Sequence, residues 1–257
     1  MHRASVAILS SGSVGNSILV ESDGRAVLID AGISCRELEK RMSVVGVEPT
    51  QVEAIVLTHE HADHMRGARR FCSEHHVPVY ATKGTLALTP LDGTKRTVIA
   101  AGHGFEIGQL RLRPFKVRHL AAEPVAFTII SGSKKIGIAS DLGSITTNVI
   151  EEMSESDLIL VEANYDEKML LAGTYPEFLK RAIRGDHGHL SNADAGALSA
   201  KAAAENTEKV VLVHLSKENN TPEKARETVT RSLERAKLDI KLEVTEHGAM
   251  NGPFSLR

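Results

Sequence analysis

The feature that most constrains this chain is a short histidine-rich segment, Thr58-His59-Glu60-His61-Ala62-Asp63-His64. It reads His-x-His-x-Asp-His and directly follows the apolar run 54–57, a pattern typical of a buried strand that ends in a loop. Imidazoles and a carboxylate crowded at one strand end are costly to bury unless a cation compensates them. The segment therefore predicts a metal-binding loop.

Three further candidate ligands also follow apolar runs, namely His119 after 114–118, Asp141 after 135–140 and His214 after 210–213. Imidazole and carboxylate groups hold borderline divalent ions, and strand ends can direct them to one point. Together with the histidine-rich segment they offer seven groups, which is more than one tetrahedral ion needs. The sequence thus predicts two ions that share a bridging carboxylate, an arrangement suited to attack on a phosphoryl group.

Isolated histidines and cysteines receive a different interpretation. Lone histidines such as His75 and His247 are expected to be surface or satisfied core residues. The two cysteines, Cys35 and Cys72, show no Cys-x-x-Cys spacing, so they are predicted to be buried or idle thiols in a reducing cytosol.

Length and composition fit one large α/β domain. The chain has 257 residues, of which 42% are hydrophobic and 25% charged, as in ordinary globular proteins. No run approaches the roughly 18 apolar residues of a membrane span, and residues 1–13 lack the pattern of a signal peptide. We therefore expect a cytoplasmic protein without a membrane partner.

Charge is unevenly distributed along the chain. The net charge is −2, yet residues 65–118 contain ten Lys and Arg against three acidic residues, and the rest of the chain is therefore acidic. A basic segment next to the metal motif could present a positive face to a nucleic-acid backbone. Alternatively, Arg111, Arg113 and Lys116, spaced by two, merely line the solvent face of a strand. Both interpretations remain open at this point.

Hydrophobic periodicity predicts strands first and helices mainly later, without a linker or repeat between them. The expected strands are 5–9, 16–21, 25–29, 54–57, 77–81, 105–117, 125–130, 135–140 and 158–162. The expected helices are 35–45, 66–74, 191–205 and 222–236, with Ser191 and Asn192 available to cap the third. This order is consistent with an α/β sandwich of the αββα type.

Four further motifs carry a family resemblance. They are Leu28-Ile29-Asp30-Ala31-Gly32, the loop 10–16, Gly188-His189-Leu190-Ser191-Asn192, and the segment 214–220 that begins with His214. Together with the histidine-rich segment, they make the chain resemble the metallo-β-lactamase-fold hydrolases, most closely the YycJ/WalJ-type exonuclease group and more distantly tRNase Z. The resemblance runs nearly end to end and implies one metallo-β-lactamase αββα domain over 1–257, without a β-CASP insertion.

The resemblance also implies a ligand set. The first ion would be bound by His59, His61 and His119, and the second by Asp63, His64 and His214, with Asp141 bridging the two. Zinc is the expected metal and manganese the alternative. The histidine at position 61 favours hydrolysis, because the flavodiiron branch of the superfamily carries a carboxylate there.

A catalytic set follows from the same resemblance, namely Asp63, Glu162 and His189. Glu162 ends the strand 158–162 and His189 precedes a helix, as in the tRNase Z arrangement in which a Glu orients a His that protonates the leaving oxygen. Such a histidine can donate a proton near neutral pH. The alternative is a buried Glu–His pair with a structural role.

Five polar residues are expected to bind substrate. Ser11, Ser13 and Asn16 lie in a Ser/Gly loop whose amides and hydroxyls can hold a phosphate, and Lys217 and Asn219 follow the last predicted ligand. An ordinary Ser/Gly turn and simple helix capping would explain the same residues.

Three functions compete. The leading hypothesis is a metal-dependent phosphodiesterase, a DNA or RNA exonuclease that uses a hydroxide activated by two metal ions. The alternative is a hydrolase of a small cyclic phosphodiester, a thioester or a lactone. The third is a scaffold without activity, which a complete ligand set disfavours. The sequence does not show whether the substrate is DNA or RNA, and it does not show the oligomeric state.

Overall fold

Two seven-stranded sheets pack face to face in the computed structural model, which describes residues 4–256. In the first sheet the strands lie in the order β14-β1-β2-β3-β4-β5-β6. Their bounds are β1 (Ala4–Ser10), β2 (Ser17–Ser22), β3 (Arg25–Ile29), β4 (Val52–Val56), β5 (Val79–Thr82), β6 (Arg96–Ile99) and β14 (Asn251–Leu256).

The second sheet has the order β13-β12-β11-β10-β9-β8-β7. Its strands are β7 (Phe105–Ile107), β8 (Leu110–Lys116), β9 (Val125–Ser131), β10 (Lys134–Ala139), β11 (Leu158–Glu162), β12 (Lys209–Val213) and β13 (Lys241–Val244). Residues such as Val56, Phe127 and Leu160 interlock between the two sheets and are almost completely buried. This shared apolar layer holds the sandwich together.

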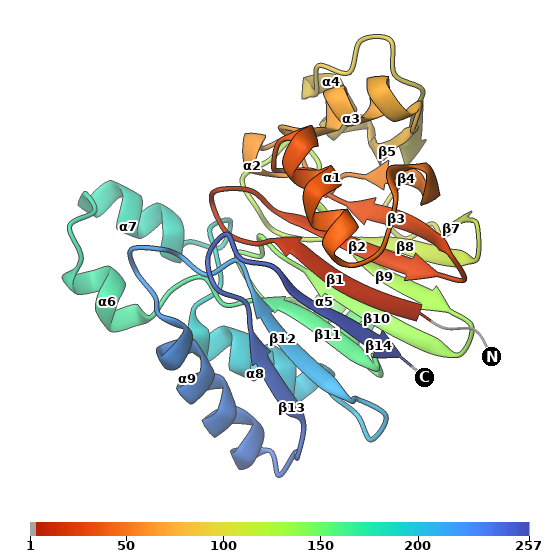
Figure 1. Cartoon of the computed structure of the whole chain (residues 1–257). Coiled ribbons are helices and arrows are strands. Elements are labelled where there is room, and N and C mark those ends of the chain that lie inside the picture. Colours follow the sequence, from red (N-terminus) through yellow and green to blue (C-terminus); the bar gives the residue numbers. More distant parts are fainter. Residues whose placement is uncertain (1–3, 257) are drawn as a thin grey trace.

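Helices cover both outer faces of the sandwich (Figure 1). On the first sheet lie α1 (Cys35–Val44), α2 (Ala62–Met65), α3 (Ala68–His75) and α4 (Lys83–Leu88), and the short 3-10 helix Pro49–Gln51 precedes β4. On the second sheet lie α5 (Thr147–Met153), α8 (Asn192–Ala202) and α9 (Pro222–Arg235). Because each outer face has its own buried apolar cluster, the expected αββα class is confirmed.

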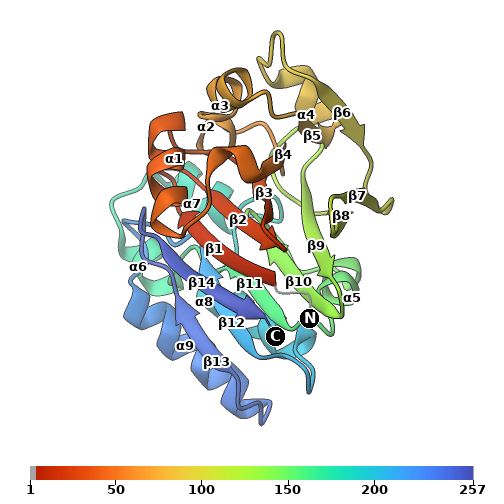
Figure 2. The same ribbon diagram turned by 45° about the vertical axis from the view of Figure 1, so that its right-hand side comes forward.

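Two helices stand apart from the outer layers. α6 (Glu167–Ala172) and α7 (Glu177–Arg184) project from one end of the sandwich, between β11 and α8 in the chain (Figures 1 and 2). Within the described residues, short helices and single strands therefore fill the chain between Asp141 and His214, and it contains no inserted domain. This agrees with the absence of a β-CASP domain expected from the resemblance.

Strand direction brings several strand ends to one place. β3, β4, β5 and β6 run parallel in the first sheet, and β10, β11, β12 and β13 run parallel in the second. Ligands in α/β sheets are commonly bound beyond the carboxyl ends of such strands. Asp30, His59, Asp141 and His214 all follow these ends directly or within three residues.

The sequence-based element boundaries are mostly confirmed, with one correction. The single strand expected at 105–117 is a hairpin, since the chain reverses at Gly108, which has a φ of +55°. A continuous β-prone pattern concealed this turn. The sequence patterns also did not predict α2, α4 to α7, β6, β13 and β14. Across residues 4–256, no helix has the length and apolar character that crossing a membrane requires.

Gly32 is a point of close backbone contact between the loop after β3 and the histidine-rich segment. A Cβ built there would lie 1.7 Å from the carbonyl oxygen of Asp63 and 2.5 Å from the amide nitrogen of Asn16. The backbone N–H of Asn16 already donates to the backbone carbonyl oxygen of Asp63 at 2.7 Å. Only glycine therefore fits where these two loops meet.

We predict that Gly32→Ala lowers the free energy of unfolding by about 3 kcal/mol, the upper end of what overpacking costs. Urea denaturation measures this change. Gly104→Ala is the matched control, because a Cβ at Gly104 meets only ordinary contacts at 3.5 Å and beyond. Equal stability of the two variants would contradict the close contact.

Candidate metal centre

Three non-glycine residues with left-handed backbone conformation lie at the strand ends. Asp30 follows β3 with a φ of +60°, Asp141 follows β10 with +54°, and His214 follows β12 with +57°. This conformation costs non-glycine residues on the order of 1 kcal/mol each, and such strain clusters at functional sites. Here the left-handed conformation turns the backbone sharply after each of the three strands. The three side chains thereby come together where the two sheets meet.

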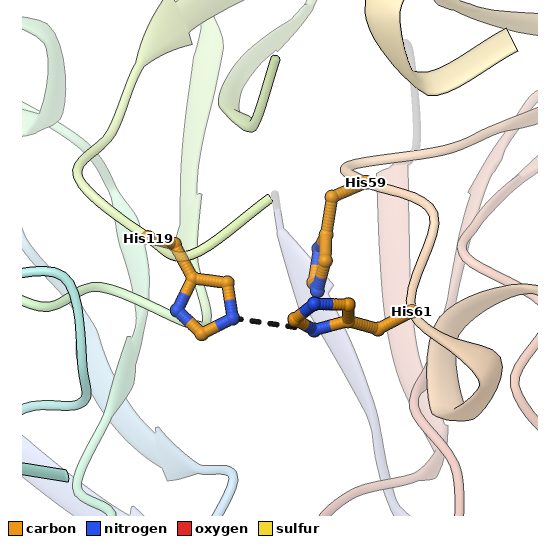
Figure 3. Close-up of side chains that lie close together, drawn as sticks. All are labelled: His59, His61 and His119. Carbon is orange, nitrogen blue, oxygen red and sulfur yellow. Dashed lines mark hydrogen bonds between the residues drawn. The ribbon is translucent and has the colours of Figure 1, made fainter. Parts of the chain in front are cut away.

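The first group consists of His59, His61 and His119, whose rings face one another (Figure 3). His61 Nε2 lies 3.0 Å from the carbonyl oxygen of Leu120, and His119 Nδ1 lies 3.0 Å from that of Gly188. A carbonyl only accepts, so both of these nitrogens carry the proton. The remaining nitrogens, His61 Nδ1 and His119 Nε2, are 3.4 Å apart, which is the contact drawn as a dashed line in Figure 3, and both are directed away from these carbonyls toward each other.

His59 completes this group with a third free lone pair. The Thr58 hydroxyl donates to Asp30 Oδ2 at 2.8 Å, so His59 Nδ1 must donate to that hydroxyl at 2.9 Å. Nε2 of His59 is then an acceptor, and it is buried without a hydrogen-bond partner. Burial, assisted by the charge of His64, holds the pKa of His59 well below its usual range. A neutral ring with an unpaired nitrogen fits a metal ligand.

The second group is formed by Asp63, His64 and His214, and Asp141 lies between the two groups. His64 donates from Nδ1 to Asp30 Oδ2 at 2.7 Å, and its Nε2 lies 3.0 Å from Asp141 Oδ2 and 3.6 Å from Asp63 Oδ2. On its other side, Asp141 Oδ1 lies 3.7 Å from His119 Nε2. The buried Asp141 Oδ2 has no hydrogen-bond donor of good geometry, although His64 Nε2 lies close to it.

The electrostatics of the second group require positive charge. Burial opposes ionisation of Asp141, yet the charges of His214 and His64 hold the pKa of this carboxyl well below its usual range. Burial also opposes a charge on His64, but the carboxylates of Asp141 and Asp30 outweigh it and raise the pKa of His64 well above its usual value. Protonated histidine thus supplies the positive charge that a divalent ion would supply as well. The donor set fits such an ion.

Glu162 is a completely buried carboxylate at the end of β11 that accepts four hydrogen bonds. Its Oε1 accepts from Nδ1 of both His189 and His214 at 2.7 Å, and its Oε2 accepts from the amides of Leu142 and Leu190 at 2.8 and 3.1 Å. Both imidazoles therefore keep Nε2 for the site. This is the usual way in which a carboxylate orients a functional histidine.

The pKa values of Glu162 and His189 depend on each other. Burial opposes ionisation, but the charge and hydrogen bonds of His189 and His214 lower the pKa of Glu162 to about 2. Burial likewise opposes a charge on His189, but the Glu162 carboxylate outweighs it and raises the pKa of His189 to about 9. At neutral pH the His189 ring accordingly holds a proton that it can donate.

A cavity of about 540 Å³ opens over these groups. Its floor includes His61, Asp63, His119, Asp141, His189 and His214. One wall is apolar and comes from α7 and the loop before it, with Tyr175, Leu179, Ala182 and Ile183, and the rim includes Ser13, His187 and Lys217. The structure thus brings together all nine residues that the sequence places in metal binding or proton transfer. Asp30 and Thr58, which the sequence did not single out for this role, orient His59 and His64.

The expected substrate-binding residues fall into two sets. Ser13 and Lys217 line the cavity, and their role in substrate binding stays a prediction. The other three do not reach the cavity. Ser11 accepts a hydrogen bond from the His214 amide at 2.7 Å, and Asn16 donates to Asp63 Oδ2 at 3.2 Å. Asn219 is buried beside Gly173. Ser11 and Asn16 thus position candidate ligands, because their polar atoms are already used within the protein.

The basic segment 65–118 contributes no residue to the lining of the cavity. Several of its cations have local partners, such as Arg70 with Glu74 at 2.7 Å and Arg113 with Glu152 at 2.9 Å. Along β8, Arg111, Arg113 and Lys116 alternate with buried residues. The structure thus favours the interpretation of these three as the solvent face of a strand.

Sequence and structure comparisons agree with this geometry. The family model described as "Beta-lactamase superfamily domain" matches residues 25–215. The chain is 31% identical to exodeoxyribonuclease WalJ of Streptococcus pneumoniae, over 91% of this chain and 89% of that protein. It is 32% identical to exodeoxyribonuclease YycJ of Bacillus anthracis, over 88% of each.

A solved structure confirms the fold over the whole chain. The metallo-beta-lactamase fold protein YhfI from Bacillus subtilis superposes with a TM-score of 0.76 at 17% identity, covering 98% of this chain and 99% of that one. The family model covers most of the chain, and its region includes every candidate ligand. The chain therefore belongs to the beta-lactamase superfamily, as a hydrolase of the metallo-β-lactamase fold.

Proposed function

We propose that this protein is a metal-dependent phosphodiesterase that removes nucleotides from the end of DNA. The observation that carries the proposal is a single cavity lined by the candidate ligands His61, Asp63, His119, Asp141 and His214 together with His189, a proton donor held by a buried carboxylate. The similarity to two exodeoxyribonucleases over about nine-tenths of the chain supports DNA as the substrate. The cytoplasmic location expected from the sequence stays a prediction.

The donor set divides into two ion sites. We propose that His59, His61 and His119 hold one divalent ion, that Asp63, His64 and His214 hold the other, and that Asp141 is shared. Zinc fits best because imidazole ligands predominate, and manganese is the alternative because two carboxylates are present. When bound, paired divalent ions lower the pKa of water and polarise a phosphoryl group.

The protein's own residues orient the substrate and move a proton. His189 is placed to donate from Nε2 to the leaving oxygen of the scissile phosphodiester, and Glu162 keeps its ring fixed and protonated. Lys217 at the rim can contact a phosphate of the next nucleotide. The apolar wall with Tyr175 and Leu179 offers a non-polar surface to the terminal base.

One observation favours a second candidate, a hydrolase of a small cyclic phosphodiester, a thioester or a lactone. Lys217 is the one lysine or arginine among the residues that line the cavity, and the described basic segment lies elsewhere. A small ester needs little positive charge, whereas a polynucleotide is usually held by several cations. The two candidates differ in how their activity responds to salt.

We predict that Asp63→Ala abolishes turnover while the free energy of unfolding stays close to that of the parent protein. Asp63 is partly exposed and lines the cavity, so its loss removes a ligand but little packing. Elemental analysis should show fewer bound ions. Asp239→Ala, at an exposed position outside the cavity lining, is the control. Near-parental activity of Asp63→Ala would show that its assignment is wrong.

We predict that His189→Ala retains metal and substrate binding but lowers the rate of DNA hydrolysis by about 10²–10⁴-fold, the usual contribution of a general acid. The loss should shrink with a nitrophenyl phosphodiester, whose leaving group needs no proton. His187→Ala is the matched control, since this exposed histidine lines the same cavity. An equal loss on both substrates would exclude His189 as the proton donor.

Glu162→Gln should differ from His189→Ala in one respect. Because Glu162 also orients His214, its substitution should lower the metal content as well as the rate. Its effect should therefore persist in part with the nitrophenyl substrate, and elemental analysis separates the two contributions.

We predict that the apparent affinity for single-stranded DNA falls steeply with salt and that Lys217→Ala reduces the log–log slope by about 0.7, the value of one phosphate contact. Lys201→Ala, on the exposed face of α8, should leave the slope unchanged. The measurement is KM as a function of salt concentration. A salt-independent KM for DNA would favour the small-ester candidate.

A further inference from the structure

A second group of potential metal ligands lies between α1 and α3, outside the cavity lining. It consists of Cys35 and Glu39 on α1 and Glu74 and His75 on α3. One ligand atom from each residue lies within 4.8 Å of all the others. Cys35 Sγ is 3.2 Å from Glu74 Oε2 and 3.5 Å from Glu39 Oε1, and His75 Nε2 is 2.8 Å from that Glu39 oxygen.

Helix geometry explains how four residues from two helices meet. Cys35 and Glu39 are four residues apart and therefore lie on the same face of α1. Arg70 on α3 binds Glu74 Oε1 at 2.7 Å, which leaves Oε2 directed at the cysteine. Cys35 is buried, whereas Glu74 is exposed, so the group is closed on the core side and accessible from solvent.

The proton count of this group is unfavourable without a cation. The Cys35 thiol has one proton, but two carboxylates lie within hydrogen-bond distance of its sulfur. One of the two must therefore face the sulfur lone pairs. The charge of the Glu39 carboxylate is stabilised by His75 only if the His75 ring donates a hydrogen bond to it. A divalent ion would remove the conflict, because a thiolate, an imidazole and two carboxylates can all coordinate it.

We propose that Cys35, Glu39, Glu74 and His75 form a structural zinc site that joins α1 to α3. A thiolate, an imidazole and carboxylates are the ligand types that bind zinc in tetrahedral sites. Charge is balanced as well, since three negative ligands face one divalent ion and the neighbouring Arg70 guanidinium. All four positions are taken by side chains, as in structural sites and unlike catalytic ones.

The site would brace the backbone behind the candidate metal centre. α1 begins shortly after Asp30, and α3 begins shortly after His64. The two connecting loops are already joined by hydrogen bonds from the Ala31 amide to the His64 carbonyl at 2.7 Å and from the Gly67 amide to the Ala31 carbonyl at 2.8 Å. An ion between the helices would fix the same two loops from the opposite side.

Cobalt substitution tests this site independently of activity. The candidate metal centre has no cysteine ligand, and Cys35 and Cys72 are the only cysteines of the chain. After metal removal and reloading with Co²⁺ under a non-thiol reductant, we expect the near-ultraviolet charge-transfer band of a cobalt–thiolate bond. Cys35→Ser should abolish this band. Cys72→Ser should retain it, since Cys72 is buried in the same layer but is not one of the four residues.

Two further variants separate this site from the proposed catalytic one. Asp63→Ala should keep the band, whereas Glu39→Gln should weaken cobalt binding at this site while preserving the fold. With zinc, elemental analysis should show one ion fewer in Cys35→Ser than in the parent protein, and the melting temperature should fall. Absence of the band in the parent protein, or its persistence in Cys35→Ser, would overturn the proposal whatever the enzyme hydrolyses.

Discussion

The hydrogen bonds to the buried Glu162 carboxylate are the interaction on which the rest of the site depends. An ionised carboxylate without solvent is costly unless its lone pairs are used, and Glu162 uses them on two imidazoles and two amides. These donors come from the loop after β10, the segment before α8 and the end of β12. One side chain thereby fixes three backbone segments and the orientation of His189 and His214.

Asp30 has the same role in the first sheet. It accepts from the amide and hydroxyl of Thr58 and from the His64 ring, and through Thr58 it also fixes His59. Each sheet therefore contributes one buried carboxylate that orients imidazoles, and Asp141 lies between the two sets. The left-handed backbone at Asp30 and Asp141 is the conformational cost of this arrangement, which the buried hydrogen bonds offset.

The sequence predicted those parts of the molecule in which local pattern and position suffice. Strands such as 25–29 and 158–162 were predicted to the residue, and the candidate ligands were found because they follow apolar runs. β14 could not be predicted, because it is defined by pairing with β1 at the other end of the chain. Short helices such as α6 were missed because they have too few turns for a periodicity.

The sequence does not show which partner a polar side chain contacts, and this explains the residues whose surroundings differ from the expected ones. Ser11 and Asn16 lie beside the site in the chain, but they bond to His214 and Asp63 and not toward the cavity. Cys35 and His75 appeared isolated because forty residues separate them, and only the packing of α1 on α3 brings them together.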